Sequence, residues 1–349
     1  MKVAFYVYPT AFQSPGGGEI LLLKTKEYLE KEGQPVTLLN PWTDKLKDFD
    51  ILHTFGSVKD CLPMMKAARL AGIKNVLSTV CWYSWRSAWG THGSAKDRSL
   101  AVLRHGAKVF LPWIPSQRKT MMEISDMLCP NSEVEAQQLI SFFGASRNKI
   151  SVLPTGVDPV FAQATPELFV KKYNLKDFVL CVGRIEPRKN QLNMIRALSG
   201  QTVKFVLIGD YVPHYKAYYE QCRKEAGENI VFLGGFEHGS PLLASAYAAC
   251  NTFLLASWLE TPGLAALEAG LAGAKIVITS DGATKEYFKD YASYVLPGDT
   301  ADIRAKTLQA CGGPANPKLK QFVLENYLWQ RVAQKTKSVY EAVASGKAR

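Results

Sequence analysis

The stretch Phe178-Val179-Leu180-Cys181-Val182-Gly183-Arg184-Ile185-Glu186-Pro187-Arg188-Lys189-Asn190 decides the fold of this 349-residue chain. Its first five residues are all apolar, and a glycine follows them. A short apolar run bounded in this way predicts a strand over 178–182 that is buried on both faces, as in a parallel sheet. Charged residues and a new helical pattern come directly afterwards, which is typical of an α/β unit.

The same alternation of strands and helices continues on both sides of this stretch. We expect earlier strands at 2–8, 36–39, 51–53, 76–80, 128–129 and 150–153, and helices at 19–31, 60–71 and 132–143. We expect later strands at 204–208, 230–232, 252–255 and 275–279, with helices between them. The turn-rich segment Pro154–Pro159 separates the two series.

The pattern therefore predicts an α/β protein with two Rossmann-like domains in tandem. The expected bounds are 1–155 and 156–327, followed by a C-terminal helix over 328–349 that can pack back on the first domain. Ligands of open parallel sheets bind at the carboxyl ends of the strands. Two such sheets facing a central cleft would accordingly place a ligand between the domains.

Composition is that of an ordinary globular protein and argues against several other classes. The chain is 47% hydrophobic and carries a net charge of +11, which suits an anionic ligand, an anionic membrane surface or simple solubility. No nucleic-acid-binding motif accompanies that charge, so we expect no nucleic acid partner. The seven cysteines show no C-x-x-C spacing, and no signal peptide or membrane-spanning run is evident, which predicts a cytoplasmic protein.

Three segments carry residues suited to an anionic ligand. The first is Pro15-Gly16-Gly17-Gly18-Glu19, ahead of the first helix, where backbone N–H groups can approach an anion, although a plain flexible turn is the alternative. It lacks the G-x-G-x-x-G spacing of a dinucleotide site, which argues against a Rossmann oxidoreductase. The second pairs Arg184 with Lys189 after the strand at 178–182, and these two cations can neutralise a diphosphate.

The third segment runs from Ser257 to Ala269 and joins a strand to a helix. Pro262 and Gly263 mark the helix start, whose free N–H groups form an anion cradle. Glu260 lies in the preceding loop, where it can face a sugar. Glu268 falls on an apolar helix face, where a carboxylate needs a polar partner such as the vicinal hydroxyls of a ribose.

Together the three segments resemble the retaining GT-B glycosyltransferases of the GT4 family. Those proteins carry a Gly-Gly loop after the first strand, a G-R-x-x-x-x-K segment and an E-x7-E motif, which here runs from Glu260 to Glu268. The segments Cys129–Glu133 and Leu153–Asp158 are also similar to family sequences. The resemblance covers almost the whole chain, in the family's order.

The resemblance implies a metal-independent, hexosyltransferase-type enzyme without a cofactor. It would move a sugar, with retention, from a UDP-, GDP- or ADP-linked donor to a glycan, a lipid-linked acceptor or another hydroxyl. Glu260, Arg184 and Lys189 would carry catalysis. The implied donor site consists of Gly16, Gly17, Arg184, Lys189, Glu260, Thr261, Pro262, Gly263, Leu264 and Glu268.

One departure from the family keeps alternatives open. Cys81 stands after the fourth strand, where many members have a His near the donor sugar. A glycosyltransferase-like binding protein with impaired catalysis is therefore one alternative, and a GT-B sugar-nucleotide epimerase is another. Asp48-Phe49-Asp50 precedes a strand and is interpreted as turn carboxylates instead of a metal motif, and His53 is interpreted as structural.

Residues 78–120 combine aromatic and basic side chains in a way that favours an acceptor surface. The segment holds Trp82, Trp85, Trp89 and Trp113 and seven Lys or Arg against the single acid Asp97. Aromatic and cationic groups together suit sugar stacking, anionic lipids and membrane interfaces, although an internal loop with core aromatics is the alternative. We expect Trp82, Trp85 and Arg86 to contact the acceptor, and a peripheral location at the inner face of the membrane.

Overall fold

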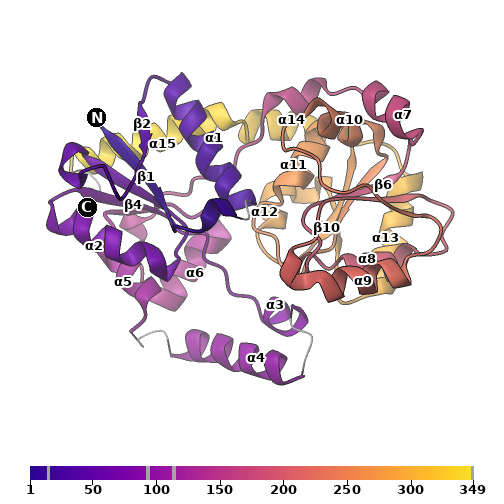
Figure 1. Ribbon diagram of the computed structural model, residues 1–349, viewed down its shortest axis with the longest axis horizontal. Helices are drawn as coiled ribbons and strands as arrows, with labels where there is room; N and C mark the ends of the chain where they lie inside the picture. The colour runs from indigo at the N-terminus through magenta and orange to yellow at the C-terminus, as the bar shows by residue number, and fades with distance from the viewer. Residues whose placement is uncertain (14–15, 92–94, 112–114, 347–349) are drawn as a thin grey trace. The chain divides into compact units, whose positions relative to one another are not determined.

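The computed structural model describes residues 1–13, 16–91, 95–111 and 115–346, and the chain forms two compact units (Figure 1). Unit 1 contains Met1–Tyr83, Gly106–Gly156 and Tyr327–Arg349, whereas unit 2 contains Ser84–His105 and Val157–Asn326. The grouping of residues 84–105 with unit 2 differs from the expected bounds of 1–155 and 156–327.

Two contacts explain why residues 84–105 belong to unit 2. The Ser84 hydroxyl donates a hydrogen bond to the Asp281 carboxylate at 2.6 Å. The ring of Trp258 lies so close to Gly90 that a Cβ there would sit 2.2 Å from it. Neither contact has a signal in the local sequence.

Unit 1 is built on a parallel sheet, which has five strands within the described residues, in the order β2-β1-β3-β4-β5. The strands are β1 (Val3–Val7), β2 (Val36–Leu38), β3 (Ile51–Phe55), β4 (Lys74–Ser78) and β5 (Met127–Leu128). The expected strand at 150–153 is not formed. That segment makes one bridge, between Ile150 and Leu128, because β5 itself is only two residues long.

Alternating side chains bury both faces of this sheet. Val3 and Phe5 of β1 join one core cluster, and Ala4 and Tyr6 join another. The first cluster lies under α1 (Gly17–Lys31) and α15 (Trp329–Ala344). The second lies under α2 (Leu62–Leu70), α5 (Gln117–Ile124) and α6 (Glu133–Phe143). This is the period-two pattern of a strand buried on both faces.

Unit 2 is built on a second parallel sheet, which has six strands among the described residues, in the order β11-β10-β9-β6-β7-β8. The strands are β6 (Val179–Val182), β7 (Phe205–Ile208), β8 (Ile230–Phe232), β9 (Thr252–Leu255), β10 (Lys275–Thr279) and β11 (Ser293–Val295). The edge strand β11 was not expected from the sequence.

Unit 2 also contains helices, some of which connect its strands. They are α3 (Trp85–Gly90), α4 (Ala95–Phe110), α7 (Glu167–Tyr173), α8 (Gln191–Leu198), α9 (Lys216–Glu225), α10 (Pro241–Ala249), α11 (Leu264–Leu271), α12 (Thr284–Phe288), α13 (Thr300–Gly312) and α14 (Pro317–Asn326). Helix α8 packs on α9 and α13, and α11 packs on α10 and α14. Helix α4 begins in unit 2 and ends in unit 1. No helix in the described part of the chain is both long enough and apolar enough to cross a membrane.

The strand order of unit 2 determines where a ligand can bind. From β6 the chain proceeds to β7 and β8 on one side, then returns to β9, β10 and β11 on the other. The connections after β6 and β9 therefore diverge in opposite directions from neighbouring strands. Such a switch point leaves a crevice at the carboxyl ends of the two strands.

Candidate functional site

The loops that follow β6 and β9 are tied together by Asn190. This residue ends the 3₁₀ turn Pro187–Lys189 in the left-handed conformation, with φ of 61°. Its side-chain amide donates to the carbonyls of Ala256 and Pro297 at 2.8 and 2.7 Å. The backbone N–H of Trp258 donates to the carbonyl of Arg188 at 2.9 Å. These bonds fix the two loops at the switch point.

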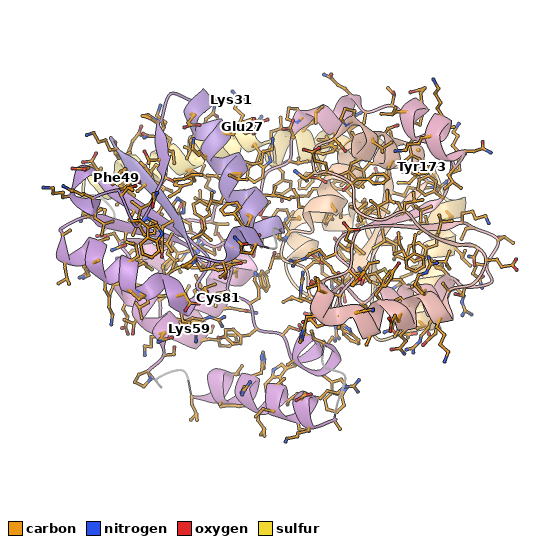
Figure 2. All side chains as sticks on the ribbon, in the orientation of Figure 1. Glu27, Lys31, Phe49, Lys59, Cys81 and Tyr173 are labelled. Carbon is orange, nitrogen blue, oxygen red and sulfur yellow. The ribbon has the colours of Figure 1, made fainter. Side chains whose placement is uncertain are left out.

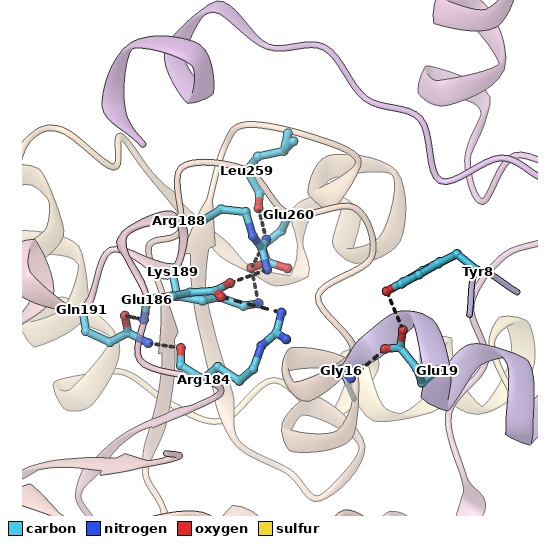
Figure 3. A network of polar contacts seen from close by, with 10 residues as sticks. All are labelled: Tyr8, Gly16, Glu19, Arg184, Glu186, Arg188, Lys189, Gln191, Leu259 and Glu260. Carbon is cyan, nitrogen blue, oxygen red and sulfur yellow. Dashed lines mark hydrogen bonds and ion pairs between the residues drawn. The ribbon is translucent and has the colours of Figure 1, made fainter. Parts of the chain in front are cut away.

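A network of charged side chains lies at these loops (Figure 3). Lys189 Nζ is 2.6 Å from Glu260 Oε1, and Arg188 lies 4.0 Å from the same oxygen. Arg188 also contacts Glu186 Oε1 at 3.0 Å, and Arg184 lies 3.6 Å from Glu186 Oε2. Three cations thus face two carboxylates, so the network retains one positive charge.

The cations and carboxylates of the network differ in exposure. The side chains of Glu186 and Glu260 are 8% and 6% exposed, whereas those of Arg184 and Arg188 are 39% and 37% exposed. Burial raises the pKa of Glu260, but the charges of Lys189 and Arg188 outweigh burial and lower it overall. The Glu260 carboxylate therefore stays ionised. Together with Glu186 it positions the guanidinium groups, which remain accessible to an anion.

The start of α11 provides backbone donors beside this network. Gly263 caps the helix in the left-handed conformation, with φ of 72°, which favours glycine. The first N–H groups of a helix have no intrahelical partner and attract anions. Thr261, Pro262 and Leu264 around the cap are half-buried. The structure thus joins Glu260, Lys189 and Arg184 in one network. Gly263, the N-cap residue of α11, lies in the same loop as Glu260.

Glu268 belongs to a different polar cluster. It lies within α11 and is buried, as its apolar surroundings in the sequence suggested. One carboxylate oxygen lies 2.7 Å from His238 Nε2, and the other accepts a hydrogen bond of 2.8 Å from the hydroxyl of Tyr247. The polar partners that a buried carboxylate requires are thus supplied by the chain itself.

Gly16 and Gly17 lie in unit 1, at the start of α1. The Gly16 N–H donates to Glu19 Oε2 at 2.7 Å, and the hydroxyl of Tyr8 donates to Glu19 Oε1 at 3.0 Å (Figure 3). The Gly16 N–H, which was expected to meet a bound anion, therefore has a carboxylate partner within the chain. Pro15, the first residue of the glycine segment, lies outside the described residues.

The loop after β4 is held by Glu135. This carboxylate accepts hydrogen bonds from the Thr79 hydroxyl at 2.5 Å, from the Cys81 N–H at 2.6 Å and from the Asn131 N–H at 2.9 Å. The Ser132 side chain accepts a hydrogen bond from the Glu135 N–H at 3.1 Å and thereby caps α6. Burial raises the pKa of Glu135 to about 7 despite these donors.

Cys81, labelled in Figure 2, is buried in this loop. His53 is buried between the hydroxyls of Tyr340 and Ser78, 2.6 and 2.9 Å from its two ring nitrogens. Burial lowers the pKa of His53 to about 3, so the ring is neutral. These contacts agree with the structural interpretation of His53.

The residues expected to contact the acceptor are divided between the units. Trp82 lies in unit 1, and its indole nitrogen is buried without a hydrogen-bond partner among the described residues. Trp85 and Arg86 lie in unit 2, on α3. Trp85 is 44% exposed, and its ring centroid lies 4.1 Å from that of His105. Trp113 lies outside the described residues.

Sequence reasoning did not assign several residues that complete these clusters. Glu186 and Arg188 lay within the segment that supplied Arg184 and Lys189, so the dense alternation of charge could have indicated them. Nothing local to His238 or Tyr247 pointed to Glu268, because both partners come from other parts of the chain. Among the described residues, no three His, Cys, Asp or Glu side chains converge as a metal site would require.

Comparisons with known proteins show that the chain is similar to glycosyltransferases. Residues 168–311 match the family described as glycosyl transferases group 1. A D-inositol 3-phosphate glycosyltransferase from Kribbella flavida is 28% identical over 244 residues, which is 63% of this chain and 57% of that protein. A protein of the same name from Paenarthrobacter aurescens is 26% identical over 280 residues, covering 73% and 66%. The chain thus spans little more than half the length of curated relatives such as the first.

Solved structures share the fold along the whole chain. Sucrose-phosphate synthase from Thermosynechococcus elongatus has a TM-score of 0.76 at 16% identity, covering 99% of both chains. The Anabaena protein HepE in complex with UDP-glucose has a TM-score of 0.70 at 17% identity, covering 98% of this chain and all of that one. The α/β fold with two parallel sheets of the GT-B class is therefore confirmed, as is the resemblance found in the sequence.

Proposed function

We propose that this chain, whose residues 168–311 match the glycosyl transferases group 1 family, transfers a sugar from a nucleotide-diphosphate donor to a hydroxyl acceptor with retention of anomeric configuration. One observation carries this proposal. Lys189, Arg188 and Arg184 are gathered at the carboxyl ends of β6 and β9 by two buried carboxylates. This site suits a diphosphate leaving group, because an accessible positive charge is held there before any ligand arrives.

In this proposal the network stabilises charge that develops as the donor bond breaks. Arg184 offers a forked contact to phosphate oxygens, and Lys189 offers a point charge. The N–H groups at Gly263 and Leu264 add backbone donors, with Thr261 and Pro262 shaping the turn. Donors of this kind contribute roughly 3 kcal/mol each to the transition state. These chain cations supply the positive charge, so we propose a reaction that needs neither a cofactor nor a metal.

Glu260 and Glu268 are proposed to bind the two ends of the donor. Glu260 is held by Lys189 at 2.6 Å and would contact the sugar. Glu268 would bind the ribose hydroxyls, because carboxylates accept paired hydrogen bonds from vicinal hydroxyls. In unit 1, the Gly16–Gly17 turn is proposed as a further contact for the donor's phosphates, with Gly17 at the start of α1 as its backbone donor.

A UDP-sugar is one of three proposed donor classes, beside GDP- and ADP-sugars. HepE binds UDP-glucose, and an Escherichia coli protein of 13% identity was solved with UDP-2-fluoro glucose. For the acceptor we propose a glycan or a lipid-linked hydroxyl compound bound near Trp82, Trp85 and Arg86. We further propose a cytoplasmic protein, peripheral at the inner face of the membrane, without a nucleic acid partner. The alternatives of an epimerase or an impaired binding protein are not favoured, since the network is intact.

A donor panel tests the proposed function. Wild-type protein is incubated with UDP-, GDP- and ADP-sugars and candidate acceptors, and products are identified by mass spectrometry. Lys189→Ala and Glu260→Ala should each lower the transfer rate by about 10² to 10³, because each removes or misplaces a charged group at the leaving diphosphate. Lys171→Ala, which removes an exposed lysine on α7, should leave the rate unchanged. Thermal stabilisation by NAD alone, with no sugar product, would overturn the proposal.

A further inference from the structure

The cluster around Glu268 contains His238, which the proposed mechanism does not use. His238 lies in the connection between β8 and α10, and its side chain is 30% exposed, against 3% for Glu268. It contacts Glu268 Oε1 at 2.7 Å, whereas Tyr247 occupies Oε2 from the buried side. Burial raises the pKa of Tyr247, which keeps its hydroxyl protonated as a donor.

The geometry leaves acceptor capacity on the carboxylate. A carboxylate offers about four lone-pair sites on two oxygens. Tyr247 and His238 each use one site, on different oxygens, so each oxygen of Glu268 retains a site for another donor. Two neighbouring hydroxyls of a ribose need that arrangement. Because Glu268 is only 2% exposed, it depends on fixed donors to keep its orientation.

The loop that carries His238 is pinned close to the sheet. The Gly235 N–H donates to Asp210 Oδ1 at 2.9 Å, and a Cβ at Gly235 would lie 2.2 Å from the other carboxylate oxygen. Phe236 stacks on Tyr173 with ring centroids 6.0 Å apart and planes 16° apart. The imidazole therefore approaches Glu268 from a loop whose residues just before His238 are held in place.

We propose that His238 is a positioning residue of the donor site, which orients the Glu268 carboxylate toward the vicinal hydroxyls of the nucleotide's ribose. This inference rests on the proposed function, since it requires a ribose diphosphate at Glu268. His238 thus links the loop after β8 to the ribose contact.

Binding of ribose and dideoxyribose nucleotides distinguishes a role of His238 in positioning Glu268 from a general effect of the substitution on folding. Dissociation constants for UDP and 2′,3′-dideoxy-UDP are measured by calorimetry, with the GDP and ADP pairs used where UDP does not bind. His238→Ala should weaken UDP binding about tenfold, because a charge-assisted hydrogen bond to the carboxylate is lost. The same variant should change dideoxy-UDP binding less than twofold, since that ligand has no hydroxyls for Glu268.

Two substitutions and one control sharpen the test. His238→Gln should restore UDP affinity to within about threefold, because the Gln amide nitrogen can occupy the place of Nε2. His238→Asn should not restore it, because its amide is too short to reach Glu268. The control His214→Ala removes an exposed histidine of the same unit and should leave both constants unchanged.

The possible failures have different meanings. If wild-type protein binds no ribose diphosphate, the proposed function fails. In a second outcome, wild-type protein binds UDP while His238→Ala loses affinity for both nucleotides by the same factor. That result would leave the proposed function standing and would refute the role of His238. Tighter UDP binding by His238→Ala would also refute it, because the imidazole would then obstruct the ribose.

Discussion

At the scale of the residue, Glu135 shows how burial changes the chemistry of one carboxyl. Its oxygens accept three hydrogen bonds, from Thr79, Cys81 and Asn131, and thereby anchor the loop at the position where Cys81 departs from the family pattern. Burial nevertheless raises its pKa from 4.5 to about 7. The folded protein thus holds this proton more tightly than the unfolded chain does.

The raised pKa predicts a pH dependence of stability. The stabilising effect of the Glu135 proton is complete below pH 4.5 and is lost as pH rises to about 7. Across that window the free energy of unfolding of the wild type should fall by about 3 kcal/mol relative to Glu135→Gln, which does not titrate. Urea denaturation at several pH values measures the difference, and parallel curves for the two proteins would contradict it.

At the scale of the element, the α3–α4 segment exposes apolar and cationic side chains together. Trp85, Trp89 and Leu103 are 44%, 55% and 68% exposed. Arg98 lies over the ring of Trp89, 5.8 Å from its centroid. Aromatic rings that remain in water beside arginines are typical of surfaces that meet lipid headgroups.

This surface predicts binding to anionic membranes. Replacing Arg86, Arg98 and Arg104 with Ala should lower partitioning onto phosphatidylglycerol vesicles at least tenfold, because each cation near the surface contributes about 1 kcal/mol. Co-sedimentation measures the partitioning, and pure phosphatidylcholine vesicles show how much of it depends on charge. The control variant Lys171→Ala, Lys172→Ala, Lys176→Ala removes the same charge elsewhere in unit 2. If both triple variants lost partitioning equally, membrane binding would not depend on the α3–α4 surface.

At the scale of the whole molecule, each unit is assembled from segments that are distant in the sequence. The chain passes from one unit to the other after Tyr83, His105, Gly156 and Asn326. Unit 1 is completed only by α15, whose Trp329 is buried in its core and packs closely against Gly156. A C-terminal helix therefore stabilises the N-terminal sheet.

Truncating that tryptophan should affect the two units unequally. Trp329→Ala leaves a large cavity in the core of unit 1 and should lower its free energy of unfolding by about 3–5 kcal/mol. Hydrogen exchange followed by mass spectrometry reports each unit separately, so peptides of β6 to β11 serve as the internal reference. Equal loss of protection in both units would show that they unfold together, contrary to this expectation.

Much of the fold and part of the site could be predicted from the sequence. The apolar runs around 3–7 and 179–182 indicate buried strands, because a parallel sheet covered on both faces buries such runs completely. Residues directly after a strand, such as Arg184, were correctly expected at its carboxyl end. The edge strand β11 was missed and the segment 150–153 was wrongly expected to be a strand, since strand pairing depends on the neighbouring strands.

The sequence by itself therefore determined the two α/β series, their order and the charged residues at their strand ends, because these follow from periodicity and chain direction. Only the tertiary structure decided which of those residues meet. Lys189 and Glu260 are 71 residues apart, and His238 and Glu268 are 30 apart. Such partners are selected by the packing of separate elements, so no local pattern records them.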